Sequence, residues 1–194
     1  SPQARPHQPI HPCGWGTAMA ERLRVLTYNI RREGPEVDAG DSWEHRRQAV
    51  VDLLRGSGAS IIGLQEVRPG QLAFLAASLS PEYTHVGEGR DTDRSGEACP
   101  VFVRSREFQV ARSETVWISP TPEVPGSKHP GAHCPRVVTC TALRRPAGGT
   151  LFCLNTHLDH AGLNVPAPDF VVQAEQADAV CRLADRFCGA APCP

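Results

Sequence analysis

Ala59-Ser60-Ile61-Ile62-Gly63-Leu64-Gln65-Glu66-Val67 is the stretch that decides the fold of this chain. Its branched apolar residues are typical of a short strand that is buried on both faces. The strand ends on Gln65 and Glu66, and a turn signal follows at Pro69-Gly70. A carboxylate at the mouth of a buried strand is costly unless a cation meets it, and ligand sites in α/β proteins lie at such strand ends. Glu66 is therefore a candidate ligand for a hard metal ion. The alternative is a glutamate that caps a helix or forms a salt bridge.

A strand and a helix precede this stretch. Residues 23–28 alternate apolar and polar side chains, as a strand does, and Asn29 follows at the strand's end. A helix capped by Asp41 or Ser42 comes next. Strand, helix and strand at this spacing predict a βαβ unit with two parallel strands. The two strands then end on the same edge of one sheet, which brings Asn29 and Glu66 together.

The second half of the chain has a different period. A helix is predicted over residues 71–79 and a last helix over residues 170–187. Between these helices we predict short strands separated by turn-rich loops, typical of an antiparallel meander, at residues 83–87, 101–104, 108–117, 136–143 and 150–155.

A polar cluster follows the last of these strands. The buried strand over residues 151–154 runs into Asn155-Thr156-His157-Leu158-Asp159-His160. One histidine at the edge of a core is usually structural. Two histidines and an aspartate within four residues at a strand end favour a functional site instead.

Composition and length indicate one soluble domain. The chain has 194 residues, 40% of them apolar and 21% charged, with a net charge of −1. This charge neither implies nor excludes nucleic acid as substrate. We expect most of the basic pairs to be solvated, namely Arg22 with Arg24, Arg31-Arg32, Arg46-Arg47 and Arg144-Arg145.

The sequence also gives expectations about location and metal content. No apolar run approaches the roughly 20 residues that span a bilayer, and no secretory signal is present. We expect a cytoplasmic or other soluble intracellular protein, with a disordered leader at residues 1–20 and a domain at residues 21–194. The eight cysteines include no CxxC pair. A zinc site that joins the C-terminal cysteines to His157 or His160 is the alternative to buried free thiols.

Several motifs together resemble the endonuclease/exonuclease/phosphatase superfamily, in the right order over residues 23–186. The resemblance rests on Leu26-Thr27-Tyr28-Asn29-Ile30, Ile62-Gly63-Leu64-Gln65-Glu66-Val67 and Leu154-Asn155-Thr156-His157-Leu158-Asp159-His160. Shorter segments extend it, namely Ser95-Gly96-Glu97, Trp117-Ile118-Ser119-Pro120-Thr121-Pro122 and Pro135-Arg136-Val137-Val138-Thr139.

The resemblance implies an α/β fold, part of a four-layer sandwich with two mixed sheets face to face and helices outside. It implies Mg²⁺-dependent hydrolysis of a phosphoester, with Mn²⁺ as a possible substitute. The implied roles are metal ligation by Glu66, metal or phosphate binding by Asn29, stabilisation of the scissile phosphate by His157, orientation of that histidine by Glu97, and substrate binding by Arg136 and Asp159.

Two further motifs of the superfamily do not occur in this sequence, namely Gly-Asp-x-Asn and the C-terminal Ser-Asp-His. We therefore expect a domain that is truncated before the Gly-Asp-x-Asn strand, with one face of the first sheet left open. Two hypotheses follow. One is a metal-dependent phosphodiesterase or phosphatase whose substrate class (nucleic acid, lipid or sugar phosphate) is open. The other is a non-catalytic interaction module whose open sheet binds a protein partner.

Overall fold

The computed structural model describes residues 22–34, 39–160 and 170–189. The predicted disordered leader at residues 1–20 lies outside this part of the chain. The elements follow one another in the order β1 (Val25–Asn29), the 3-10 helix η1 (Ala39–Asp41), α1 (Trp43–Gly56), β2 (Ile61–Gln65), α2 (Pro69–Leu79), β3 (Tyr83–Val86), β4 (Val101–Arg104), β5 (Gln109–Trp117), β6 (Val137–Arg144), β7 (Thr150–Thr156) and α3 (Val171–Gly189).

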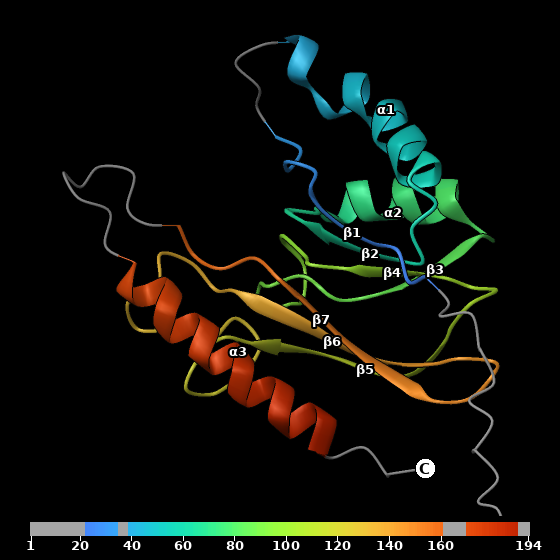
Figure 1. Cartoon of the computed structure of the whole chain (residues 1–194). Helices are drawn as coiled ribbons and strands as arrows, with labels where there is room; N and C mark the ends of the chain where they lie inside the picture. Colours follow the sequence, from blue (N-terminus) through green and yellow to red (C-terminus); the bar gives the residue numbers. More distant parts are fainter. Residues whose placement is uncertain (1–21, 35–38, 161–169, 190–194) are drawn as a thin grey trace, which may run out of the picture.

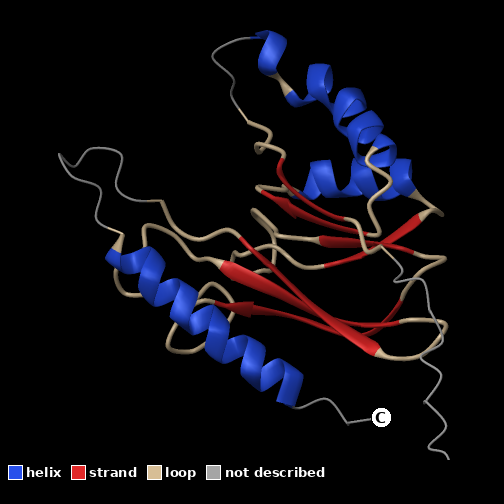
Figure 2. Cartoon of the chain, viewed as in Figure 1, coloured by secondary structure: helices blue, strands red, loops and turns tan. Residues whose placement is uncertain are grey.

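These elements form four layers, as the sequence predicts (Figures 1 and 2). Helices α1 and α2 cover the outer face of a four-stranded sheet in the order β1-β2-β4-β3. A three-stranded sheet in the order β5-β6-β7 packs against the other face, and α3 lies outside it. The fold is therefore a mixed α/β sandwich with helices on both outer surfaces.

The predicted βαβ unit is confirmed. Strand β1 pairs in parallel with β2, and the register sets Asn29 opposite Gln65. Helix α1 connects the two strands and buries the apolar side that its sequence presents, with Trp43 and Leu54 at 4% and 0% exposure. Strand β2 is buried along its whole length, as its continuous apolar sequence predicts.

The predicted meander is only partly correct. Strands β5, β6 and β7 form an antiparallel meander, but β3 and β4 join the first sheet, with β4 between β2 and β3. Strand β4 suits a central position because its side chains serve two interfaces. Phe102 packs into the core beneath the helices, whereas Val101 and Val103 pack between the sheets. Because all four residues of β4 are buried, the sequence has no alternation that indicates which sheet the strand joins. Periodicity alone therefore did not predict this assignment.

The two sheets are fastened together at Gly63 of β2. A side chain at this position would collide with Asn155 of β7, because a Cβ atom built there lies 2.7 Å from Asn155 Oδ1. Asn155 Nδ2 donates to the backbone oxygens of Leu64 and Pro100 at 2.8 and 3.0 Å, and its Oδ1 accepts from Gln65 Nε2 at 2.8 Å. We call this set of contacts the Asn155 clasp. A residue that looks like part of the polar cluster thus holds the sheets in contact.

The expected open face is limited to one strand. Among the described residues, α1 and α2 cover one side of the first sheet and the second sheet covers most of the other. Strand β1 lies at the edge, and its side chains alternate between the helices and the second sheet. Those on the second-sheet side (Val25, Thr27 and Asn29) are exposed, and Val25 reaches 59% exposure. The opening is therefore a strip along β1, because β7 reaches only as far as β2 at the Asn155 clasp.

Helix α3 completes the fourth layer. It spans 19 residues, and its Leu183 and Phe187 pack on Val138 and Cys140 of the second sheet. Neither α3 nor any other described helix has the combined length and apolar character that a membrane crossing requires.

Candidate active site

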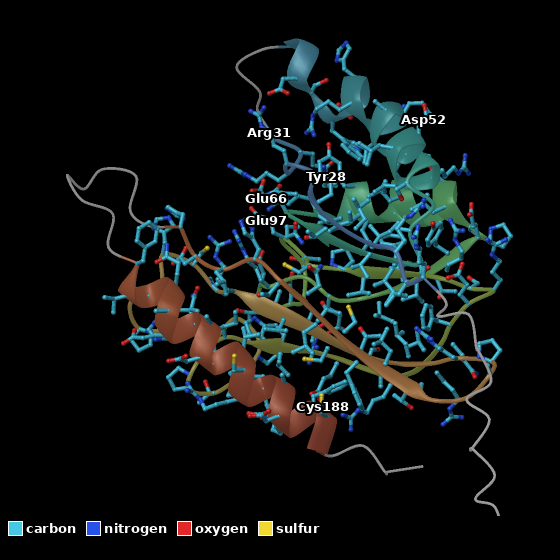
Figure 3. All side chains as sticks on the ribbon, viewed as in Figure 1. Tyr28, Arg31, Asp52, Glu66, Glu97 and Cys188 are labelled. Atoms are coloured by element: carbon cyan, nitrogen blue, oxygen red, sulfur yellow. The ribbon has the colours of Figure 1, made fainter. Side chains whose placement is uncertain are left out.

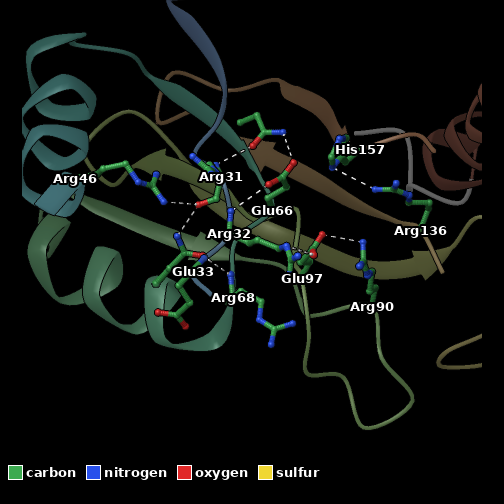
Figure 4. A network of polar contacts seen from close by, with 12 residues as sticks. Arg31, Arg32, Glu33, Arg46, Glu66, Arg68, Arg90, Glu97, Arg136 and His157 are labelled. Atoms are coloured by element: carbon green, nitrogen blue, oxygen red, sulfur yellow. Dashed lines mark hydrogen bonds and ion pairs between the residues drawn. The ribbon is translucent and has the colours of Figure 1, made fainter. Parts of the chain in front are cut away.

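Glu66 and Asn29 meet at the ends of β1 and β2, as the βαβ unit predicts. Asn29 Nδ2 donates to Glu66 Oε1 at 2.8 Å, and the backbone N–H of Arg32 donates to Oε2 at 3.1 Å (Figure 4). Glu66 has a φ of 63°, a left-handed conformation that costs energy in a residue with a side chain. Backbone strain of this kind is found most often at functional sites, where the position of the side chain is important.

The carboxylate of Glu66 is kept ionised by its neighbours. Burial raises its pKa, but the hydrogen bonds from Asn29 and from the Arg32 N–H, together with the charge of Arg32, outweigh burial and lower it below 4.5. An ionised carboxylate with free lone pairs fits a hydrated Mg²⁺ or Mn²⁺ ion, since Mg²⁺ keeps several waters and takes few protein ligands. In the described residues no group of three or more His, Cys, Asp or Glu side chains could hold a metal ion. The fit of Glu66 to a metal therefore rests on its own carboxylate and on water ligands.

Asn29 fits a metal less well than the sequence predicts. Its Oδ1 accepts a hydrogen bond from the backbone N–H of Arg31 at 2.9 Å, and its Nδ2 is directed at Glu66. Both ends of the amide are engaged inside the protein. This geometry makes Asn29 a residue that positions Glu66, and direct ligation of a metal ion by Asn29 stays a prediction.

The loop after β1 is held by two side chains that the sequence analysis missed. Gln71 of α2 is fully buried; its Nε2 donates to the oxygen of Arg31, and its Oε1 accepts from the N–H of Glu33. Arg46 of α1 donates to the carbonyl oxygens of Ile30 and Arg31. Nothing in the pattern marks these contacts, since an arginine and a glutamine on amphipathic helices are usually solvated. They fix the backbone that presents an N–H group to Glu66.

Glu97 belongs to the site but not in its predicted role. Its carboxylate pairs with Arg90 Nη1 at 2.8 Å and lies 3.8 Å from Arg32 Nε (Figure 4). No hydrogen bond joins Glu97 to His157 in the described structure. The prediction that Glu97 orients this histidine is therefore not met by contact, because two arginines take up its carboxylate. It acts on His157 through its charge alone.

His157 contacts Arg136. The distance between His157 Nδ1 and Arg136 Nη1 is 3.3 Å. Because a guanidinium only donates, Nδ1 accepts, and the neutral ring carries its proton on Nε2. Burial, followed by the charge of Arg136, lowers the pKa of His157 below 6.5, and Glu66 and Glu97 oppose this effect without reversing it. At neutral pH and without metal, His157 is a neutral hydrogen-bond donor.

Asp159 is buried and pairs with groups inside the protein. Its side chain is 3% exposed and pairs with Arg136 Nη2 at 2.9 Å. Its carboxylate also accepts the backbone N–H groups of His133 and His160, and its own N–H donates to Gln176 Oε1 at 2.7 Å. The predicted substrate-binding role of Asp159 stays a prediction. Asp159 fixes Arg136, which in turn contacts His157.

One small pocket joins these groups. Its lining includes Glu66, Glu97, Arg136 and His157, together with Arg90 and Cys99. These residues come from loops of both sheets (Figure 3 labels Glu66 and Glu97). Two carboxylates, two guanidinium groups and an imidazole N–H around one space can bind a cation and an anion together. The pocket has a volume of about 10 Å³, so its lining groups lie close together.

The chain was compared with known proteins. A family model described as the Endonuclease/Exonuclease/phosphatase family matches residues 26–193. A search of curated proteins found no match.

Solved structures give a consistent result. An endonuclease/exonuclease/phosphatase from Bacteroides vulgatus is 30% identical with a TM-score of 0.77, over 86% of this chain and 61% of that protein. A family protein from Bacteroides thetaiotaomicron is 28% identical with a TM-score of 0.77, over 88% of this chain and 60% of that one. A mannosyl-6-phosphatase from the same organism has the same identity, TM-score and coverage of this chain, and 62% of its own length is covered. The chain thus spans less than two thirds of the length of these structures.

Proposed function

Because this chain belongs to the endonuclease/exonuclease/phosphatase family, we propose that it carries the metal-binding half of a Mg²⁺-dependent hydrolase of phosphoester bonds. The observation that carries the proposal is the single pocket in which Glu66, Arg136 and His157 meet. Glu66 offers a carboxylate for a cation, and Arg136 and His157 offer donors for an anion. The three residues lie next to the ends of β2, β6 and β7.

Each residue has a definite part in this proposal. Glu66 would hold Mg²⁺ or Mn²⁺, and Asn29 fixes the carboxylate that does so. The ion, when bound, neutralises charge on the phosphate oxygens. His157 would donate a hydrogen bond from its Nε2–H to a nonbridging oxygen, where negative charge grows in the transition state. Arg136 donates a hydrogen bond to His157 Nδ1. This hydrogen bond keeps the ring proton on Nε2, the nitrogen that would contact the substrate.

A sugar phosphate monoester is the first substrate class to test. The support is the similarity to a mannosyl-6-phosphatase at 28% identity over 88% of this chain. A nucleic-acid or lipid phosphodiester is the alternative class. The chain's net charge of −1 gives no independent reason to favour a polyanionic strand.

We propose that turnover by these 194 residues alone is weak. The printed sequence contains neither Gly-Asp-x-Asn nor Ser-Asp-His, the motifs expected to orient and activate the attacking water. The loss of such acid–base assistance commonly lowers rates by about 10²–10⁴-fold. The second candidate function, an interaction module, is favoured by one observation, namely the exposed side of β1 that faces the second sheet. A partner there would cover Val25 and Thr27.

The test is hydrolysis of p-nitrophenyl phosphate and of bis(p-nitrophenyl) phosphate with Mg²⁺, with Mn²⁺ and with EDTA. We expect slow turnover that EDTA abolishes and that His157→Ala lowers by about 10²-fold or more. His45→Ala, on the exposed surface of α1, is the matched control and should retain full turnover. Turnover that persists in EDTA, or that both variants lower equally, would overturn the proposal. Preference for the monoester would support the sugar phosphate class.

A further inference from the structure

A second pocket lies at the opposite end of the sandwich from the candidate active site. Its volume is about 810 Å³. Segments from both sheets line it: residues just before β1 and β2, the β4–β5 connection and the β6–β7 turn. In Figures 1 and 3 the β6–β7 turn and the start of β1 lie at the right, whereas the label of Glu66 lies at the left. The site proposed for catalysis therefore does not account for this pocket.

The lining of this pocket is strongly basic. It includes five arginines and a single carboxylate, and the carboxylate is Glu107. The arginines are Arg22, Arg24, Arg104, Arg106 and Arg145. The whole chain has a net charge of −1, so this concentration of positive charge is local. The fold thus brings Arg22 and Arg24, one of the basic pairs expected to be solvated, to the same place as Arg145.

Arg104 forms the buried floor of the cluster. It is 8% exposed, and its Nη2 atom contacts Tyr83 Oη at 2.8 Å and Glu82 Oε1 at 3.2 Å. Glu107 lies 3.7 Å both from Arg104 Nη1 and from Arg106 Nε, so one carboxylate is shared between two guanidinium groups. Arg104 Nε is buried without a hydrogen-bond partner in the described part of the chain. The contacts of Arg104 with Tyr83 and Glu82 hold its guanidinium in place at the base of the pocket.

Arg22 and Arg24 add charge that no described carboxylate neutralises. Arg24 Nη1 donates to the backbone oxygen of Ser57 at 2.7 Å, which fixes the side chain and leaves its charge in place. Gly58 permits this approach, because a Cβ atom there would lie 3.0 Å from the same Nη1 atom. Among the described residues, no acidic group lies within ion-pair distance of Arg22 or Arg24. A fixed arginine such as Arg24 suits bidentate binding of a phosphate group.

Apolar side chains complete the lining. They include Leu23, Phe108 and Pro146, and the guanidinium of Arg145 lies 5.6 Å from the centre of the Phe108 ring. The volume falls in the usual range for small-molecule sites. The arginines gather around one hollow instead of following a strip across the surface, which favours a compact ligand over a nucleic-acid strand.

We propose that this pocket binds a small organic molecule that carries two or more phosphate groups and an apolar ring, such as a nucleoside diphosphate. Arg24, Arg106 and Arg145 contact the phosphates, and Leu23 with Pro146 contacts the ring. This binding is separate from the proposed hydrolysis at Glu66 and His157, and it does not require a metal ion.

The test is isothermal titration of the whole chain with ADP, with pyrophosphate and with adenosine, all in EDTA. ADP should bind saturably, pyrophosphate more weakly, and adenosine not at all. Arg24→Gln and Arg106→Gln should each weaken ADP binding by about tenfold. Arg106 has a side chain that is 76% exposed, so its replacement does not endanger the fold. Arg182→Gln, an exposed arginine on α3, removes the same charge away from the pocket and should leave binding unchanged.

Several results would overturn the proposal. One is the absence of saturable ADP binding up to about 1 mM. Another is an equal loss in Arg182→Gln, which would indicate general charge attraction. Binding that survives Arg24→Gln but disappears in His157→Ala would place ADP at the other pocket. A single-stranded oligonucleotide that binds more tightly than ADP would indicate a surface that binds nucleic-acid strands. Pyrophosphate that binds as tightly as ADP would mean that the pocket makes no favourable contact with the ring of the ligand.

Discussion

Arg136 holds two different groups of the candidate site with its two terminal nitrogens. One contacts His157 and the other pairs with Asp159, whose side chain is 3% exposed. The pair is buried on both sides, because the side chain of Arg136 is itself only 7% exposed. Removal of one member of a buried pair leaves the other charge unsatisfied, and this costs more than the pair contributes.

We predict that Arg136→Gln lowers the free energy of unfolding by about 3–5 kcal/mol. The reason is that the substitution leaves the buried carboxylate of Asp159 without its positively charged partner. Urea denaturation of the purified variant measures this, and Arg182→Gln on the surface of α3 is the control, with an expected change within about 0.5 kcal/mol. Equal stability of the two variants would mean that Asp159 finds another cation or opens to solvent.

The same pair predicts a pH dependence of stability. Burial raises the pKa of Asp159, but the hydrogen bonds from Arg136 and from the His133 N–H outweigh it and lower the pKa below 3.8. A carboxyl whose pKa is lower in the folded state stabilises the fold fully above 3.8 and loses this contribution as pH falls through the folded value. Unfolding free energies measured from about pH 6 to pH 2 should therefore decline more steeply for the native sequence than for Asp159→Asn. Parallel curves would contradict the prediction.

At the scale of elements, the contact between the sheets depends on a residue without a side chain. We predict that Gly63→Ala destabilises the fold by about 1–3 kcal/mol, because the new methyl group pushes against Asn155 and loosens the Asn155 clasp. Thermal unfolding followed by circular dichroism measures the change. Gly56→Ala is the matched control: nothing lies within 4 Å of a Cβ atom there, and the position ends α1. It should be neutral or slightly stabilising.

The elements and their pairing were predictable where chain connectivity constrains them. A strand, a helix and a strand close together in sequence leave little choice but a parallel pair, and that pair brings Asn29 within 2.8 Å of Glu66. The position of β4 was not predictable, because its four residues are buried on both faces and carry no alternation. Antiparallel strands join through short connections in either sheet, so only packing decides between the sheets.

The polar contacts of the site divide in the same way. His157 was predicted from its place after a buried strand, and the structure brings it to the pocket of Glu66. The binding of Glu97 by Arg90 and the anchoring of the β1 loop by Gln71 were not predictable. These partners lie on loops and helices, and their polar side chains would be expected from the sequence to face solvent. Their roles arise only when separate elements meet in space.

At the scale of the whole molecule, an edge strand and a central strand of the first sheet differ in protection. Strand β1 has one neighbour and an exposed side, whereas β2 lies between β1 and β4 and is fully buried. We predict that backbone amides of β1 exchange with deuterium at least about tenfold faster than those of β2. Mass spectrometry of the intact chain, at two protein concentrations, measures this. Equal protection at both concentrations would mean that β1 is covered, and protection that grows with concentration would identify a second copy as the cover.

The Asn155 clasp has a mechanical consequence. Asn155 stands two residues before His157, and Gly63 stands three residues before Glu66, so the point of contact between the sheets is adjacent in sequence to both chemical groups. The two sheets are thus joined directly beside the candidate site. A change that shifts one sheet relative to the other at this contact would therefore also shift His157 relative to Glu66. We expect the geometry of the candidate site to depend on the alignment of the two sheets.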